Sequence, residues 1–110
     1  MFEICKRDEN TTDIRVWGEL GKMEVRELVE AYCAYFIKLP PKQTVFVSMD
    51  DTTISFEQMF YVFTGIKTFH KKYNLIDAVN LHMRDKHLAK CCRCLILLMH
   101  PSVPVNIVLT

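Results

Sequence analysis

Hydroxyl and carboxylate side chains gather in one short stretch of the chain, directly after the apolar residues Val45 to Val47. The stretch contains Asp50, Asp51, Thr52, Thr53 and Ser55. Ser55 and Gln58 have the S-x-x-Q spacing of a capping box, in which the serine oxygen accepts a backbone N–H bond and the glutamine side chain reaches back. The pattern predicts a strand that delivers exposed hydroxyls to a helix N-terminus.

Such a junction could receive a partner protein or an anion, because a helix N-terminus offers free N–H donors and a positive dipole end. If phosphate regulates the protein, Thr53 and Ser55 are the expected acceptors. Against an anion, Asp50 and Asp51 would repel it. The structural alternative is a turn and an N-cap that only stabilise the helix, by roughly 1 kcal/mol.

A second group of reactive residues comprises Cys91, Cys92 and Cys94, with His87 one helical turn before Cys91. His87 and Cys91 share a helix face, but zinc sites normally use two ligand pairs separated by a loop, and the remaining cysteines are far away in sequence. We therefore predict no metal and no cofactor. Cys91 and Cys92 are expected to pack as small apolar groups, and Cys94 to be an exposed thiol.

Nucleophilic catalysis has little support in the sequence. Cys94 with His87, or Ser48 with a histidine, would need an orienting third group and an oxyanion site, and no spacing indicates either. His70, His82 and His100 stand at a helix end, in a strand and before a proline, where solvated or capping histidines are common. The prediction is a protein without enzymatic activity.

The elements that position these residues follow from hydrophobic periodicity. The predicted strands are Phe2 to Lys6, Ile14 to Leu20, Thr44 to Met49, Ala78 to Met83 and Val103 to Leu109. The predicted helices run from Glu24 to Leu39, before Pro40, from Ser55 to about Tyr73, and from an N-cap at Asp85 to His100.

This β-β-α-β-α-β-α-β order predicts an α/β fold with a mixed, mainly parallel sheet and helices packed against it. The first two strands form an edge hairpin, and the third strand lies at the centre of the sheet, covered by helices on at least one side. With 110 residues, half of them hydrophobic and a quarter charged, the chain is expected to form a single domain over residues 1–110.

The second and third helices each carry an apolar stripe. On the second helix it comprises Met59, Val62 or Phe63, Ile66, Phe69 and Tyr73, and on the third Leu88, Cys91, Cys92, Leu95, Leu98 and Met99. The second helix also carries more aromatic residues than one buried stripe needs, namely Phe56, Phe60, Tyr61, Phe63, Phe69 and Tyr73. Phe56 and Phe60 share one side, and Tyr61 or Trp17 is expected to be partly exposed. Because aromatic side chains often dominate binding at interfaces, this surplus favours a protein-docking surface at the start of the second helix.

Charge and hydropathy exclude several classes of protein. The net charge of +1 is spread along the chain, which argues against nucleic-acid binding. The longest apolar stretch, Leu95 to Met99, is far shorter than a membrane span, and the N-terminus lacks a signal-peptide core. Five cysteines, an odd number, fit reduced thiols. We expect a cytoplasmic protein that does not bind membranes.

Two segments carry a resemblance to a known family. Ile14 to Leu20 reads apolar-x-apolar-x-Gly-Glu-Leu before the first helix, and Val45 to Met59 reads as an apolar strand, a polar loop, a helix cap and a helix. Asn80 to Val108 supplies a strand, a turn, a third helix and a final strand. This arrangement resembles the STAS family, found in sulfate transporters and in antagonists of anti-sigma factors.

The resemblance implies a noncatalytic regulatory domain that binds another protein through the start of the second helix. The implied site residues are Asp51, Thr52, Thr53, Ser55, Phe56, Gln58 and Phe60. The chain departs from the family where Phe56 occupies the place of the phosphorylated serine or threonine, and where Gly21 replaces an aspartate. One alternative is a small structural subunit of a larger assembly, such as a virion or multiprotein particle, in which the domain packs with copies of itself or with other chains. Another is a nucleotide- or anion-binding module.

Overall fold

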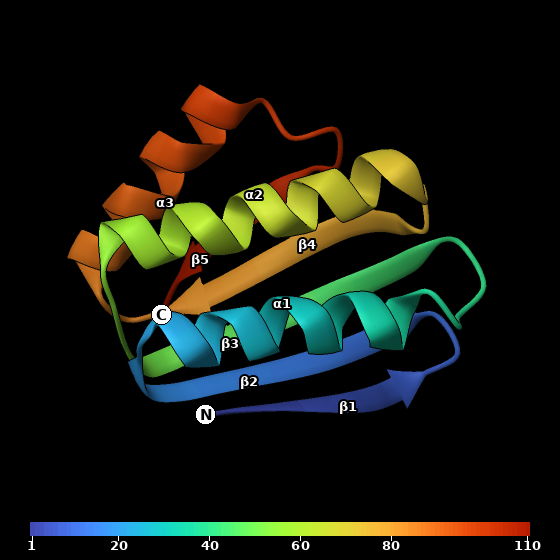
Figure 1. Ribbon diagram of the computed structural model, residues 1–110, viewed down its shortest axis with the longest axis horizontal. Helices are drawn as coiled ribbons and strands as arrows, with labels where there is room; N and C mark the ends of the chain where they lie inside the picture. Colours follow the sequence, from blue (N-terminus) through green and yellow to red (C-terminus); the bar gives the residue numbers. More distant parts are fainter.

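The computed structural model describes all 110 residues, which form five strands and three helices (Figure 1). The strands are β1 (Phe2–Asp8), β2 (Thr11–Leu20), β3 (Gln43–Ile54), β4 (Ile76–Met83) and β5 (Val105–Leu109). The helices are α1 (Lys22–Phe36), α2 (Phe56–Lys72) and α3 (Lys86–Met99). The predicted order of elements and the α/β class are confirmed.

The strands lie in the sheet in the same order as in the sequence, β1-β2-β3-β4-β5. β1 runs antiparallel to β2, whereas β2, β3, β4 and β5 are parallel to their neighbours. The edge hairpin and the central position of β3 are therefore confirmed.

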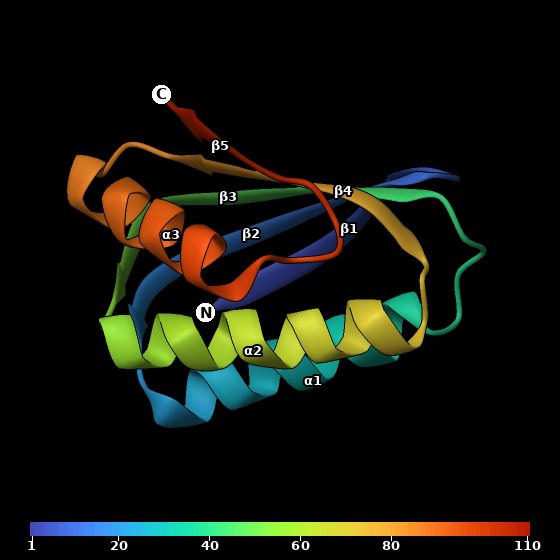
Figure 2. The same cartoon turned by 90° about the horizontal axis from the view of Figure 1, so that it is seen from above.

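All three helices cover the same face of the sheet (Figure 2). Each helix connects one strand to the next strand in the same direction across the sheet, and the right-handed crossovers of parallel strands then place every helix on one side. The opposite face has no helix over it, and we call it the open face. None of the helices is long and apolar enough to cross a membrane.

The hydrophobic core fills the space between the sheet and the helices. Its 21 residues include the fully buried side chains of Tyr32, Phe36, Met59 and Leu95. Helices α1 and α2 approach each other closely at Gly65, where an added Cβ would lie 2.8 Å from a methyl group of Val29. This close approach fixes how the outer surfaces of the two helices are arranged.

The prediction of a polar loop before the second helix is wrong, because β3 continues to Ile54. Thr52, Thr53 and Ile54 pair with Gly18, Glu19 and Leu20 of β2, so partners on a neighbouring strand hold this polar segment extended. The register shifts once, between Arg15 and Trp17, and β3 has one more residue than β2 there. Only Ser55 separates β3 from α2.

Several buried positions also differ from the prediction. Leu98 is 71% exposed and Tyr73 is 38% exposed, whereas Ala89 is completely buried on α3. The buried face of α3 contains Leu88, Cys92 and Leu95, and Leu98 lies outside it. The first helix ends at Phe36, and Leu39 lies beyond it.

Candidate protein-interaction surface

The junction between β3 and α2 has the predicted helix cap. Ser55 has an extended backbone, and its Oγ accepts a hydrogen bond from the backbone N–H of Gln58 at 3.2 Å. The Gln58 side chain makes no hydrogen bond back to Ser55, so the structure contains the first half of the capping box only. The Ser55 hydroxyl remains on the surface.

The predicted site residues divide by their exposure. Asp51, Thr53, Ser55 and Phe56 are exposed, and Gln58 is half-buried. Thr52 is only 9% exposed, and its hydroxyl donates to the Val16 carbonyl oxygen at 2.9 Å. The prediction of an exposed Thr52 hydroxyl is therefore wrong. The β2–β3 pairing turns this side chain inward and satisfies its polar group.

Three aromatic side chains near the start of α2 are exposed to solvent. Phe56, Phe60 and Tyr61 are 50%, 48% and 45% exposed, whereas their neighbours Met59 and Val62 are buried. The helix thus turns its aliphatic side toward the core and leaves these rings outside. The predicted aromatic surplus is present on the surface.

A groove of about 330 Å³ separates the first turns of α1 and α2. We call it the α1–α2 groove. It is lined by Lys22, Val25 and Arg26 from α1 and by Glu57, Gln58, Phe60, Tyr61 and Thr64 from α2. Two members of the predicted site, Gln58 and Phe60, form part of its wall. The helix-start surface therefore extends into a concavity bounded by a second helix.

The α1 side of this groove was not predicted from the sequence. Lys22 and Arg26 lie more than 30 residues before Phe60, and only helix packing brings them to the same groove. The two ion pairs of the structure, Arg7–Asp13 and Arg84–Asp50, lie elsewhere. The cations of α1 and Glu57 consequently have no intramolecular ion-pair partner.

The cysteine and histidine residues of α3 do not form a metal centre. The Cys91 sulfur lies 3.8 Å from His87 Nε2, but no group of three or more potential ligands is present. Cys92 is buried, and burial raises its thiol pKa to about 12. Cys94 is exposed, as the sequence predicts.

His70 differs most from its predicted solvated environment. It is 6% exposed, and its Nε2 forms a 2.7 Å hydrogen bond with the Tyr32 hydroxyl of α1. Burial lowers the pKa of His70 to about 4 and raises the pKa of Tyr32. The pair joins the far ends of α1 and α2, at a distance from the groove, and it has a structural role.

Comparison with known proteins identifies the fold. No family model matches the sequence, and no curated protein matches it either. Among solved structures, the anti-sigma factor antagonist SpoIIAA in its unphosphorylated form superposes with a TM-score of 0.65. The match covers 98% of this chain and 88% of SpoIIAA, at 11% sequence identity. The chain has a STAS-like fold.

The STAS-like fold accounts for the short sequence motifs that first indicated it. Gly18 of the Gly-Glu-Leu segment has φ of +83°, a left-handed conformation that glycine adopts without strain. Leu20 of the same segment is buried at the end of β2. At 11% identity the likeness concerns the backbone, and a function must be argued from the surface of this chain.

Proposed function

We propose that this STAS-like domain is a noncatalytic regulatory module that binds another protein through the α1–α2 groove and the adjoining start of α2. The observation that carries the proposal is the exposure of Phe56, Phe60 and Tyr61 beside a groove. A soluble domain gains no stability from leaving three aromatic rings half exposed, whereas a partner that covers them gains binding energy.

The composition of the groove supports a protein partner. Aromatic rings lie beside Lys22, Arg26 and Glu57, so an apolar centre is bordered by charges of both signs. This is the usual layout of a protein interface, in which a few aromatic anchors supply most of the affinity and charges at the rim set the orientation. The complementary surface would present an apolar side chain to Phe60 and a carboxylate to Lys22 or Arg26.

The fold agrees with a regulatory role. SpoIIAA is named as an antagonist of an anti-sigma factor, that is, a protein that acts on another protein. A cytoplasmic location and the absence of enzymatic activity are parts of the same proposal. Thr53 and Ser55 are exposed and stay the predicted phosphorylation sites. A phosphate on Ser55 would add negative charge at the N-terminus of α2 and beside the rings, and would change docking there.

A comparison of matched surface variants tests the proposal. Extracts of the native source are passed over three baits: the wild-type protein, Phe60→Ala and Leu97→Ala. Captured proteins are then purified, and calorimetry measures their affinity for each bait. Leu97 is 72% exposed on α3 and serves as a control for the loss of an exposed apolar side chain. Phe60→Ala is expected to lower the affinity for a direct partner by about tenfold or more, because it removes an aromatic anchor of the interface.

The reasoning fails if every captured partner binds Phe60→Ala and wild type equally, or if Leu97→Ala weakens binding as much as Phe60→Ala. Light scattering of the purified chain separates the proposal from self-assembly. A monomer at working concentration agrees with a module that awaits another protein, and an oligomer disrupted by Phe60→Ala would assign the groove to a second copy of the chain.

A further inference from the structure

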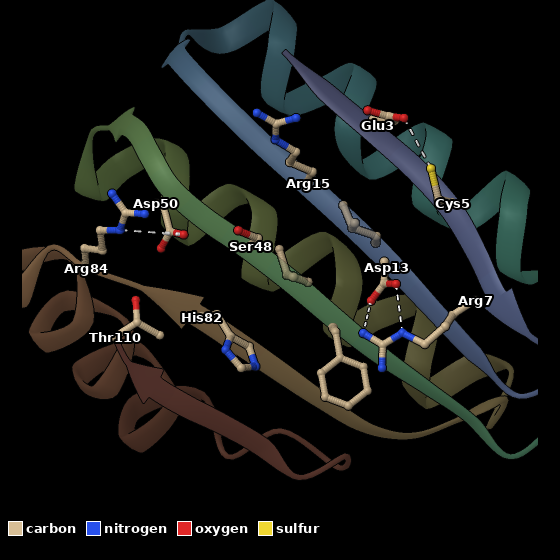
Figure 3. A pocket seen from close by; sticks show the side chains of 13 residues that line it. Glu3, Cys5, Arg7, Asp13, Arg15, Ser48, Asp50, His82, Arg84 and Thr110 are labelled. Atoms are coloured by element: carbon tan, nitrogen blue, oxygen red, sulfur yellow. Dashed lines mark hydrogen bonds and ion pairs between the residues drawn. The ribbon is translucent and has the colours of Figure 1, made fainter.

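The open face of the sheet contains a hollow of about 740 Å³, and its charged side chains pair largely with one another (Figure 3). Arg7 binds Asp13 through two hydrogen bonds, and Arg84 lies 3.9 Å from Asp50. Because these charges neutralise one another, the hollow presents no convergent set of free charges. A cavity on the helix side of the sheet has a different character.

This second cavity lies beneath α2 and has a volume of about 90 Å³. Core-facing side chains of β2, β3 and β4 form its floor, α2 forms its roof, and Leu28 and Tyr32 of α1 close one side. Its mouth consists of residues that keep part of their surface exposed, namely Phe63, Ile66, Lys67 and Pro101. Most of the lining is hydrophobic, so the cavity lacks the polar partners that ordered water needs.

The exposure of Val47 shows that this cavity interrupts the packing of the core. Val47 lies on the central strand, and its register partners Ile14 and Leu81 on the same face are 2% and 6% exposed. Its neighbours on that face of β3, Val45 and Met49, are also buried. Val47 itself is only half-buried. Because protein interiors are normally close-packed, an accessible side chain here marks a place where the space between α2 and the sheet is not filled.

The polar side chains of the lining differ in whether they have free donors. His70 Nε2 and the Tyr32 hydroxyl bond to each other at 2.7 Å. Lys67 is the charged residue of the lining, and its amine donates to the Met99 carbonyl oxygen at the end of α3. Lys67 has no carboxylate partner in the chain. Since a lysine ammonium carries three donors, two remain available at the mouth of the cavity.

The volume of the cavity limits the size of its ligand. An engineered apolar cavity of about 150 Å³ binds benzene. The cavity beneath α2 is smaller, and in proportion it holds a hydrocarbon group of about four carbons. Such a group would replace empty space by van der Waals contacts, and each CH₂ group removed from water would add to the affinity.

We infer that this cavity binds a short aliphatic carboxylate, whose tail of about four carbons lies beneath α2 and whose carboxylate pairs with Lys67. The tail would cover the accessible surface of Val47, and the carboxylate would supply the counter-ion that Lys67 lacks within the chain. The cavity and the α1–α2 groove share no residue, so the inference does not depend on the proposed function.

An amide NMR titration of the isotopically labelled full chain with pentanoate, 1-pentanol and acetate tests this inference. Pentanoate should cause saturable shifts of the amide signals around Val47, Ile66 and Val105, which line the cavity. Acetate lacks the tail and should bind at least about tenfold more weakly, because the burial of CH₂ groups drives binding. 1-Pentanol fills the cavity without a charge for Lys67 and should bind at least about threefold more weakly.

Two pairs of variants separate the roles of charge and space. Lys67→Met keeps an unbranched stem without the charge, and should abolish the preference for pentanoate over 1-pentanol. Lys71→Met removes an equal charge from an exposed position one turn farther along α2, and should leave that preference unchanged. Val47→Ile adds a methyl group inside the cavity, and should lower the affinity for pentanoate by about threefold while raising the midpoint of thermal unfolding. Val108→Ile adds the same group on the open face and should change neither quantity.

The inference is overturned if pentanoate causes no saturable shifts, if 1-pentanol or acetate binds as tightly as pentanoate, or if Lys71→Met has the same effect as Lys67→Met. It is also overturned if Val47→Ile destabilises the fold and leaves the affinity unchanged, because the cavity would then have no space for an added group. A thermal unfolding curve for each variant verifies that it remains folded.

Discussion

Protonation of His70 should make the fold unstable in mild acid. The imidazole is 6% exposed, and its one polar contact is the 2.7 Å hydrogen bond to the Tyr32 hydroxyl. The Tyr32, Phe69 and His70 rings pack against one another, with no carboxylate bonded to the imidazole. A positive charge at this position would lack both water and a counter-ion, and for this reason burial lowers the pKa of His70 to about 4.

The sign of the pH effect follows from which state binds more protons. Between pH 6.5 and about 4 the unfolded chain holds a proton on His70 and the folded chain does not. The free energy of unfolding therefore falls as the pH decreases through this window. With pKa values of 6.5 in the unfolded chain and about 4 in the folded chain, His70 lowers the free energy of unfolding at pH 5 by about 2 kcal/mol relative to neutral pH. Below pH 4 this decrease approaches about 3 kcal/mol.

Urea unfolding at pH 7.5 and pH 5, monitored by circular dichroism, measures this loss. Wild type is compared with His70→Gln, which keeps a polar side chain of similar reach but does not titrate. Other groups also titrate between these pH values, so the informative quantity is the difference in pH dependence between the two proteins. Wild type should lose about 2 kcal/mol more than His70→Gln, a large part of the stability of a small domain.

His87→Gln is the matched control, because His87 is exposed on α3. It should retain the pH dependence of wild type. Equal pH dependence in wild type and His70→Gln would refute the reasoning, and so would an NMR titration of the folded protein that finds the His70 imidazole half protonated near pH 6.5.

Three further predictions concern packing, capping and thiol accessibility. Gly65→Ala should lower the free energy of unfolding by about 1 kcal/mol in chemical denaturation, because the added methyl group meets Val29 at 2.8 Å and this clash exceeds the gain in helix propensity. Asp85→Ala should lower it by about 1 kcal/mol, since the Asp85 carboxylate accepts two backbone N–H bonds at the start of α3. A thiol reagent should modify Cys94 in the native protein, because its thiol is exposed, and should reach the buried Cys92 only after unfolding. Peptide mass mapping identifies the modified cysteines, and labelling of Cys92 in the native protein would contradict its complete burial.

Local sequence patterns predicted the elements because each pattern has a local cause. The apolar residues of α1 and α2 repeat with the helical period, and the caps at Ser55 and Asp85 bond to N–H groups two or three residues away. The left-handed backbone at Gly18 likewise depends on its own residue type. These features need no knowledge of distant parts of the chain.

The errors in the prediction arose where a distant partner decides the outcome. Asp50 to Thr53 have the composition of a turn, but β2 supplies an extended neighbour and keeps them in β3. His70 stands at a helix end, where histidines are commonly solvated, but Tyr32 lies 38 residues earlier and covers it. Leu98 is apolar, yet the position of α3 on the sheet leaves it outside.

By itself, the sequence determined the order of strands and helices, the apolar faces and the helix caps, because these depend on residue types a few positions apart. Only the tertiary structure decided which surfaces exist. Right-handed connections between sequential strands placed all three helices on one face and left no helix over the other. The packing of α1 against α2 created the groove beside Phe60, since its walls come from helices separated in sequence by β3.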